Sequence, residues 1–346
     1  MGIPSEAETV ATHADDVNRA NRIKFKIVGI GGAGIQALKG IRETLKAYLG
    51  DPYFDIDFWA LDSDLTARAT IPGTNFLQLG ATVAKGKSTR GSVALGQQAA
   101  QESREALLCA LSGAFYVLIV AGPTGGISAG AAPIVADLAR TITPDYYHHY
   151  QKGPLVAAYV SSPRDSSPAE TVLALRGKVD SLTLIFMNEA TAKTESPADS
   201  RLIGLGIELI TITAITPGLI GVDSEDIRQC LQKNPGFSRL AYGHASGEAL
   251  AIDAAKKAIS SPALEKNLSQ AGSVVFLVKG GNDMTRYNVN EAAEVIYNAC
   301  NQEAEIVFGA TVHPELQGQM EVLIQASGLP SICQINDAMT YEMSWS

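Results

Sequence analysis

Short apolar runs alternate with stretches of helical periodicity through the first 200 residues. The runs have the length and composition of buried strands, and they predict strands over residues 25–30, 56–61, 75–79, 115–121, 155–160 and 182–187. Between them, the pattern predicts helices over 35–48 and 93–111, and a third that begins near Ala131. Strands that alternate with helices predict an α/β fold, in which helices cover both faces of a parallel sheet.

The pattern changes after residue 200. Helical periodicity over 200–213 ends at Pro217-Gly218, a pair that stops helices. Beyond it, the sequence predicts helices over 224–232, 247–259 and 289–300, and strands over 273–279, 305–311 and 321–326. We therefore expect a flexible tail (1–22), a first α/β domain (23–198), a central helix (199–216), a second, smaller α/β domain (217–329) and a short tail (330–346).

Composition adds limits on partners and compartment. Of 346 residues, 46% are hydrophobic and 18% charged, which is enough apolar material for two cores. The net charge of −9 gives no overall attraction to nucleic acid or anionic lipid, so we expect neither as a partner. The cysteines form no C-x-x-C pair, and no apolar run reads as a signal peptide or a membrane span. These features predict a cytoplasmic protein.

A first glycine-rich segment follows the first predicted strand. Gly29-Ile30-Gly31-Gly32-Ala33-Gly34 matches G-x-G-x-x-G between a strand and a helix, where free backbone N–H groups attract phosphate. Asp62 ends the next strand, where a dinucleotide-binding fold places its ribose-binding acid. Taken alone, the pair favours an NAD or FAD site, and a turn that only serves packing is the alternative.

A second glycine-rich segment, residues 121–130, follows the fourth strand and opens another helix. Two such loops at the carboxyl edge of one sheet are expected to converge on one large anion, and a triphosphate suits them better than a pyrophosphate. A third loop, Lys85 to Gly91, carries three cations and narrowly misses the P-loop spacing. It is either a solvated basic loop or a phosphate contact.

The order of these segments resembles the FtsZ proteins of the tubulin/FtsZ superfamily. Residues 29–34 resemble the first phosphate loop of that family, and Ala60-Leu61-Asp62-Ser63-Asp64 resembles its A-I-N-T-D segment. Residues 113–133 resemble the segment around its G-G-G-T-G-T-G signature, and residues 217–226 resemble its catalytic loop P-G-L-I-N-V-D-F-A-D. Residues 245–248, 258–262, 289–293 and 306–310 resemble its C-terminal domain, so the likeness runs from about Ile23 to Gly328.

The resemblance implies a Rossmann-type GTPase domain, a central helix and a smaller α/β domain. It implies GTP or GDP as ligand, with Mg²⁺ possible, and a homopolymer in which protomers stack head to tail. The implied nucleotide-binding residues are Gly31, Gly32, Ala33, Gly34, Gln36, Asp62, Asp64, Lys85, Lys87, Gly122, Thr124, Gly125, Gly126, Ile127, Ser128, Gly130, Asn188 and Asp199. The implied catalytic acids are Asp223 and Asp226, which would act on the nucleotide of the neighbouring protomer. Capping of a helix N-terminus is the structural alternative for both.

Several departures from the family pattern cluster in the pocket. Ile127 and Ala129 stand at the two threonine positions of the signature, and we expect β-branched Ile127 to resist a positive φ. Pro123 has no N–H to offer, and Gly221 replaces the asparagine of the catalytic loop. The ribose-contacting Glu and Arg have no counterpart, and Asp199 matches the base-binding Asp only with an offset of one residue. The tail from Pro330 lacks the adaptor-docking peptide of the division proteins, so we do not expect those adaptors as partners.

Three functions remain open on these grounds. The first is a polymerising GTPase that hydrolyses GTP between protomers. The second is a structural filament that assembles without binding or hydrolysing nucleotide, which the altered pocket motivates. The third is a dinucleotide-dependent oxidoreductase, although no constellation of catalytic His, Cys or Tyr accompanies the glycines, and His148-His149 reads as an exposed pair.

Overall fold

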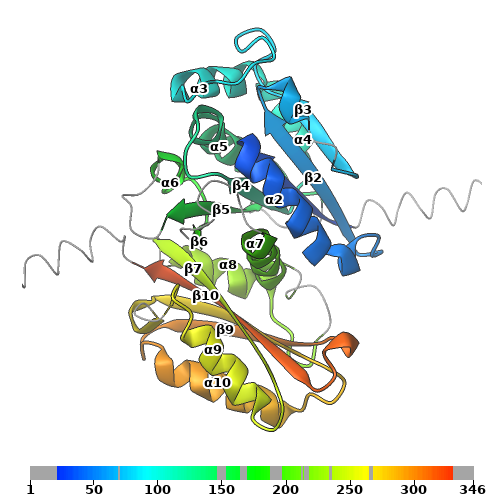
Figure 1. Ribbon diagram of the computed structural model, residues 1–346, viewed down its shortest axis with the longest axis vertical. Coiled ribbons are helices and arrows are strands. Elements are labelled where there is room, and N and C mark those ends of the chain that lie inside the picture. The colour runs from blue at the N-terminus through cyan, green and yellow to red at the C-terminus, as the bar shows by residue number, and fades with distance from the viewer. Residues whose placement is uncertain are drawn as a thin grey trace, which may run out of the picture.

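The described strands of the computed structural model form one continuous ten-stranded sheet in the order β3-β2-β1-β4-β5-β6-β7-β10-β8-β9 (Figure 1). The structure describes residues 22–68, 71–145, 153–163, 170–187, 197–211, 213, 218–233, 236–264 and 268–329. Residues 1–21 and 330–346 of the two predicted tails lie outside these ranges, as do Asn188, Pro217 and the pair His148-His149.

The first six strands are all parallel and confirm the predicted α/β sheet. They are β1 (Ile23–Ile30), β2 (Phe54–Asp62), β3 (Thr74–Gln78), β4 (Tyr116–Ala121), β5 (Leu155–Pro163) and β6 (Ser181–Met187). Their spatial order, 3-2-1-4-5-6, is that of a doubly wound sheet, whose ligands bind where the winding reverses. That point lies between β1 and β4, where Ile30 and Ala121 are register partners at the carboxyl ends of the two strands.

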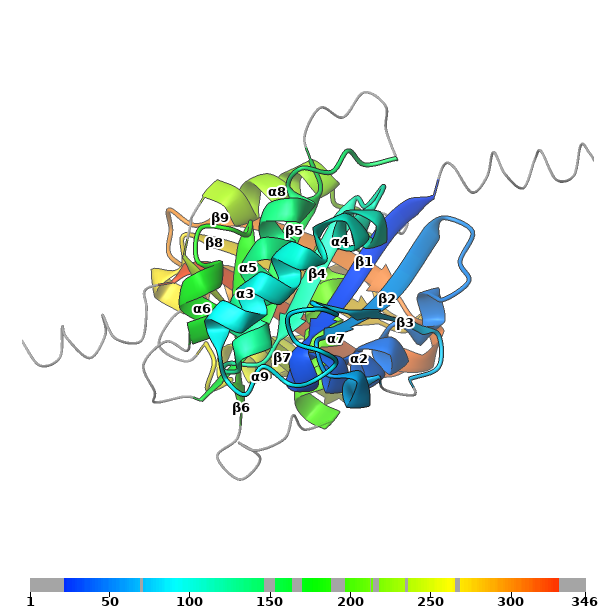
Figure 2. The same cartoon turned by 90° about the horizontal axis from the view of Figure 1, so that it is seen from above.

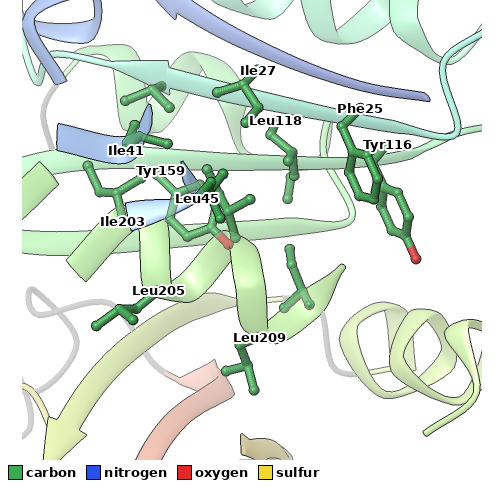
Figure 3. Close-up of a cluster of buried hydrophobic side chains, with 14 of the residues drawn as sticks. Phe25, Ile27, Ile41, Leu45, Tyr116, Leu118, Tyr159, Ile203, Leu205 and Leu209 are labelled. Atoms are coloured by element: carbon green, nitrogen blue, oxygen red, sulfur yellow. The ribbon is translucent and has the colours of Figure 1, made fainter. Parts of the chain in front are cut away.

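Helices cover both faces of this part of the sheet. One face carries α2 (Gly31–Thr44) and the central helix α7 (Pro197–Ile210), and the other carries α3 (Val93–Glu102), α4 (Arg104–Leu111), α5 (Gly126–Ala139) and α6 (Glu170–Leu175). Figure 3 shows the first core, in which the rings of Phe25 and Tyr116 stack with their centroids 4.9 Å apart. Ile41 from α2 and Ile203 from α7 belong to the same core and are fully buried.

The second part of the sheet continues from the first. It comprises β7 (Phe237–Ser246), β8 (Ser273–Gly280), β9 (Glu305–Val312) and β10 (Gln319–Leu329), and β10 runs antiparallel to both of its neighbours. The helices α9 (Leu250–Ile259) and α10 (Arg286–Ala299) pack on one face with their own core, and α8 (Ser224–Lys233) contributes to the core of the other face. Short 3₁₀ turns lie at Lys46–Tyr48, Leu65–Ala67, Leu268–Gln270 and Pro314–Leu316. Strands β6 and β7 share three residue pairs, and this short ladder joins the two parts.

A buried ionic cluster ties the central helix to both parts. The Glu208 carboxylate on α7 accepts a hydrogen bond from the Tyr48 hydroxyl, at 2.7 Å, and pairs with the Lys279 ammonium of β8, at 3.0 Å. Lys279 also lies 3.6 Å from Glu321 of β10. Removing one member of such a cluster leaves an uncompensated buried charge, so the three elements are held in one arrangement.

Most predicted elements are confirmed within a few residues, and the exceptions are informative. Helix α5 begins at Gly126 and α2 at Gly31, each several residues earlier than predicted, so the glycines belong to the first turns. The helix predicted over 93–111 is two helices, because the chain breaks at Ser103, whose hydroxyl accepts the Gly80 N–H at 2.9 Å. Strand β7 and helix α6 were not predicted. Among the described residues, no helix has the length and hydropathy needed to cross a bilayer.

Candidate functional site

The two glycine-rich segments meet at the carboxyl edge of the sheet. Helix α2 starts directly after β1, and α5 starts a few residues after β4, its neighbour in the sheet. The Ser128 hydroxyl, in the first turn of α5, donates to the Ile30 carbonyl oxygen at 3.1 Å. A Cβ placed on Gly122 would lie 2.9 Å from Cβ of Ala33. The structure therefore brings the two segments together, as their position after neighbouring strands predicts.

The glycines of the first segment have different tasks. Gly31 has a φ of 72°, which a side chain would strain. Gly34 packs so closely on β4 that a Cβ would overlap the Val120 carbonyl oxygen. Gly32, in contrast, is exposed, and a Cβ there would meet no atom within 4 Å. Helix α2 has no side-chain cap at its start, so its first N–H groups are open to an anion beside Gly32.

The second segment is built differently. Gly125, with a φ of 122°, precedes α5 and offers no side chain to cap it. Gly126 and Gly130 are buried against α3, where added Cβ atoms would collide with the carbonyl oxygens of Ser92 and Val93. These two glycines, predicted to hold nucleotide, thus let α3 and α5 approach closely. Gly96 on α3 completes the contact, because a Cβ there would collide with Gly126. Sequence reasoning missed Gly96, since a lone glycine within a helix gives no signal of its partner.

Ile127 and Ser128 fill the space between the two segments. Ile127 is 7% exposed and belongs to the core beneath α5, while Ser128 is 3% exposed. A Cβ on Gly31 would lie 2.6 Å from Ser128 Oγ and 2.9 Å from Ile127 Cγ2. The strain expected at Ile127 is absent: among described non-glycine residues, only Lys85 and Arg90 have a positive φ. The positive φ lies at Gly125 instead, so the isoleucine sits in an ordinary helical turn.

Asp62 and Asp64 follow β2 and differ in their surroundings. Asp62 is buried and accepts the Asp64 N–H at 3.0 Å, and burial raises its pKa above the ordinary value for an aspartate. Asp64 accepts hydrogen bonds from the Thr66 hydroxyl and amide, which lower its pKa. The Ser88 amide also lowers the pKa of Asp64, so this acid lies beside the loop Lys85 to Gly91.

The cationic loop is held in a defined shape. Its Gly86 carbonyl accepts the Leu65 N–H at 3.2 Å, and Glu102 of α3 accepts the N–H groups of Thr82 and Val83. Lys85 and Arg90 have φ of 54° and 49°, which is strained for residues with a side chain. The side chains of Lys85, Lys87 and Arg90 are exposed, and none pairs with an acid in the part of the chain described.

The remaining predicted binding residues are spread around this edge. Gln36 and Thr124 are exposed, near the starts of α2 and α5 respectively. Asp199 lies in the first turn of α7 and is half-buried. Asn188 lies outside the described residues, so its place relative to the loops stays a prediction.

Asp223 and Asp226 lie at the start of α8, on the opposite side of the molecule from the start of α2 (Figure 2). Asp223 Oδ1 accepts the Glu225 N–H at 2.7 Å, which is an N-cap of α8. The side chain of Asp226 is exposed and makes no hydrogen bond or ion pair with a described residue. The two acids therefore do not meet the glycine-rich segments within one chain.

The edge of the sheet has the chemistry of an anion site. Two helix N-termini without side-chain caps converge beside a loop with three free cations, and Gly32 leaves room for close approach. Backbone N–H groups at helix starts and mobile ammonium groups are the donors that phosphate groups prefer. A polyphosphate ester fits these donors.

Comparison with known proteins identifies the family and the fold. Residues 24–190 match the model of the Tubulin/FtsZ family GTPase domain, and residues 236–330 match that of the FtsZ family C-terminal domain. Among solved structures, an empty FtsZ dimer from M. jannaschii is 24% identical with a TM-score of 0.74, over 94% of this chain and 93% of that one. An FtsZ mutant from the same organism is also 24% identical, with a TM-score of 0.73 over 94% and 95% of the two chains. A GTPγS-bound CetZ2 protofilament from Haloferax volcanii is 17% identical, with a TM-score of 0.70 over 93% and 98%.

Proposed function

This chain belongs to the tubulin/FtsZ family, and we propose that it is a cytoplasmic, filament-forming protein that binds GTP at the carboxyl edge of its sheet. Copies stack head to tail, and the start of α8 from one copy completes the site of the next. Hydrolysis of GTP then takes place only between copies. The comparisons give the dinucleotide-dependent oxidoreductase no support.

The observation that carries the proposal is the meeting of two uncapped helix starts, Gly31 and Gly126, beyond the ends of neighbouring strands, with open space beside Gly32. The N–H groups of both helices suit the phosphates of one nucleotide, since each helix presents its positive dipole end. Lys85 and Lys87 add positive charges. These charges attract the triphosphate of GTP more strongly than the diphosphate of GDP, because the triphosphate is more negative.

The position of the acids supports a site shared between copies. The side chain of Asp226 is exposed and unpaired with described residues, and α8 lies on the opposite side of the molecule from the start of α2 (Figure 2), so its carboxylate is open to another molecule. We assign it the task of orienting the attacking water. Asp223, the second acid assigned to this site, also fixes the start of α8 by accepting the Glu225 N–H.

The shared site is tested by GTP turnover as a function of protein concentration. Turnover per protomer should rise as filaments form, and Asp226→Asn should lower it by about 100-fold or more while filaments persist. Asp253→Asn, on an exposed site of α9, is the matched control: it makes the same change in charge away from the site and should leave turnover unchanged. Turnover that stays flat with concentration rules out the shared site.

The cationic loop is tested separately by nucleotide affinity. Lys87→Gln should weaken GTP binding more than GDP binding, because it removes a charge assigned to the terminal phosphate. Lys256→Gln, on an exposed face of α9, makes the same change in charge away from the site and should alter neither affinity. Equal loss of GTP and GDP affinity in the Lys87 variant contradicts the assignment.

A structural filament that needs no nucleotide is the second candidate. The side chains of Ile127 and Ser128 already occupy the space beside Gly31, which favours a site too narrow for phosphate. Nucleotide extracted from the purified protein and a pelleting assay with and without GTP separate the two functions. Filaments that form equally well without GTP, from protein free of nucleotide, favour the second.

A further inference from the structure

Helices α3, α5 and α6 border an open groove of about 820 Å³ that the proposed function does not use. Gln97, Gln98 and Gln101 of α3 line one side, and Ile134 of α5 and Ala174 of α6 line the other. Val83, from the loop before α3, lies at its rim and is 39% exposed. A groove of this size, between helices and with a partly apolar lining, is the kind in which an amphipathic helix docks.

The lining combines apolar and amide groups with little net charge. The three glutamine side chains make no hydrogen bond with a described residue, so their amides are available as donors and acceptors. The two charges of the lining, Asp137 and Lys178, pair with each other. An occupant with an apolar stripe and polar flanks matches this surface better than a strongly charged one.

The described chain ends beside this groove. Leu329, the last residue of β10, is the register partner of Phe237 in β7. The Arg176 guanidinium, just after α6, lies over the Phe237 ring at 5.7 Å from its centroid. Figure 1 shows the end of β10 below α6. Lys178, two residues after Arg176, lines the groove. The chain that follows Leu329 therefore starts close to the groove.

The sequence that follows carries the matching pattern. Ile332, Ile335, Met339 and Met343 are spaced by three, four and four residues, which places them on one face of a helix. Asp337 falls on the opposite face. A helix over residues 331–344 is about 21 Å long at 1.5 Å per residue, and an extended chain of that length reaches farther.

We propose that residues 331–344 bind as an amphipathic helix in the groove between α3, α5 and α6 of the same chain. Ile335 and Met339 face Ile134 and Ala174, and the glutamine amides of α3 bind the polar flank. A segment seated there touches Val83 and therefore the loop that carries Lys85 and Lys87. The proposal stands independently of nucleotide binding.

A cysteine pair tests the placement in the full-length chain. In a background with Cys109→Ser, Cys300→Ser and Cys333→Ser, the pair Gln98→Cys and Met339→Cys should form a disulfide rapidly under mild oxidation, within a monomer. The control pair Asn298→Cys and Met339→Cys places its partner on an exposed site of α10 and should cross-link much more slowly. Equal rates for the two pairs, or cross-linking only between chains, overturns the proposal.

A charge series gives a second readout that needs no cross-link. Gln97→Glu, Gln98→Glu and Gln101→Glu together put three carboxylates along the groove, where they repel Glu342 on the flank of the apolar face. With Trp59→Phe leaving Trp345 as the reporter, this triple variant should increase iodide quenching and red-shift the emission. Asn290→Asp, Asn298→Asp and Gln302→Glu change the net charge equally on the far domain and should change neither. Unchanged fluorescence in the groove variant, or binding of the segment to anionic vesicles in place of the groove, overturns the proposal.

Discussion

The two glycine-rich segments have similar sequences and different jobs. In the first, Gly34 packs on the sheet and Gly32 faces open space. In the second, Gly126 and Gly130 pack on α3, and the neighbouring Ile127 and Ser128 are buried. The first segment therefore keeps one glycine for close approach of a ligand, while the second uses its glycines mainly to bring two helices together. A glycine pattern locates a tight contact, but the structure decides whether the contact is with protein or with ligand.

Gly34→Ala should have the largest effect on stability. The new methyl overlaps the Val120 carbonyl oxygen, which cannot move without distorting β4. We expect a loss of about 3 kcal/mol in the free energy of unfolding, even though alanine favours helices. A urea titration followed by circular dichroism measures it. If Gly34→Ala lowers the free energy of unfolding less than Gly130→Ala does, α2 moves away from the sheet more easily than α3 and α5 move apart.

Gly130→Ala should be less costly. Its Cβ lies 2.5 Å from the Val93 carbonyl oxygen and 2.7 Å from the Gln97 nitrogen, and both belong to a helix that can shift as a body. Overpacking of this kind costs about 2 kcal/mol. The same titration applies, with GTP affinity as a second measurement. Strongly reduced affinity at unchanged stability would mean that Gly130 serves the ligand after all.

Ser128→Ala should have a smaller effect, because it removes one buried hydrogen bond. The Ile30 carbonyl loses its donor from the second segment, at a cost of about 1 kcal/mol. Ser128→Thr is the control that retains the hydroxyl, although its extra methyl must fit beside Gly31. A stabilised alanine variant would contradict the role of this bond in joining the two segments.

Gly32→Ala should raise the stability of the protein, and its effect should be the smallest of the four. The added methyl meets no protein atom, and alanine restricts the unfolded chain, so stability should rise by about 0.5 kcal/mol. GTP affinity should fall, because the methyl stands where a phosphate approaches the backbone. Isothermal titration measures this, and unchanged affinity would remove Gly32 from the site.

The sequence predicts the fold well wherever local pattern and burial agree. The six parallel strands were found because each is an apolar run with turn residues on either side. Strand β7 was missed because Ser238 and Arg239 are polar yet buried, and burial lowers the pKa of Arg239 to about 10. Helix α6 was missed because its six residues are too few to show a period.

The sequence predicts where the site lies, but not how its glycines pack. Placement of both glycine-rich segments follows from their position after neighbouring strands. The start of α5 at Gly126 does not follow, because glycines disfavour helices and only close packing against α3 offsets that preference. Both Asp223 and Asp226 lie near the start of α8. Their spacing alone therefore does not predict that Asp223 caps the helix while the side chain of Asp226 is exposed and unpaired with described residues.

The short ladder between β6 and β7 gives the molecule a mechanical weak point. Its three residue pairs are fewer than those of the β5–β6 and β7–β10 ladders on either side. When the two ends of the sheet are pulled apart, the ladder with the fewest bonds carries the same load as its neighbours and yields first. A subunit stretched in an optical trap should therefore lengthen in two steps, with each half of the sheet still folded after the first.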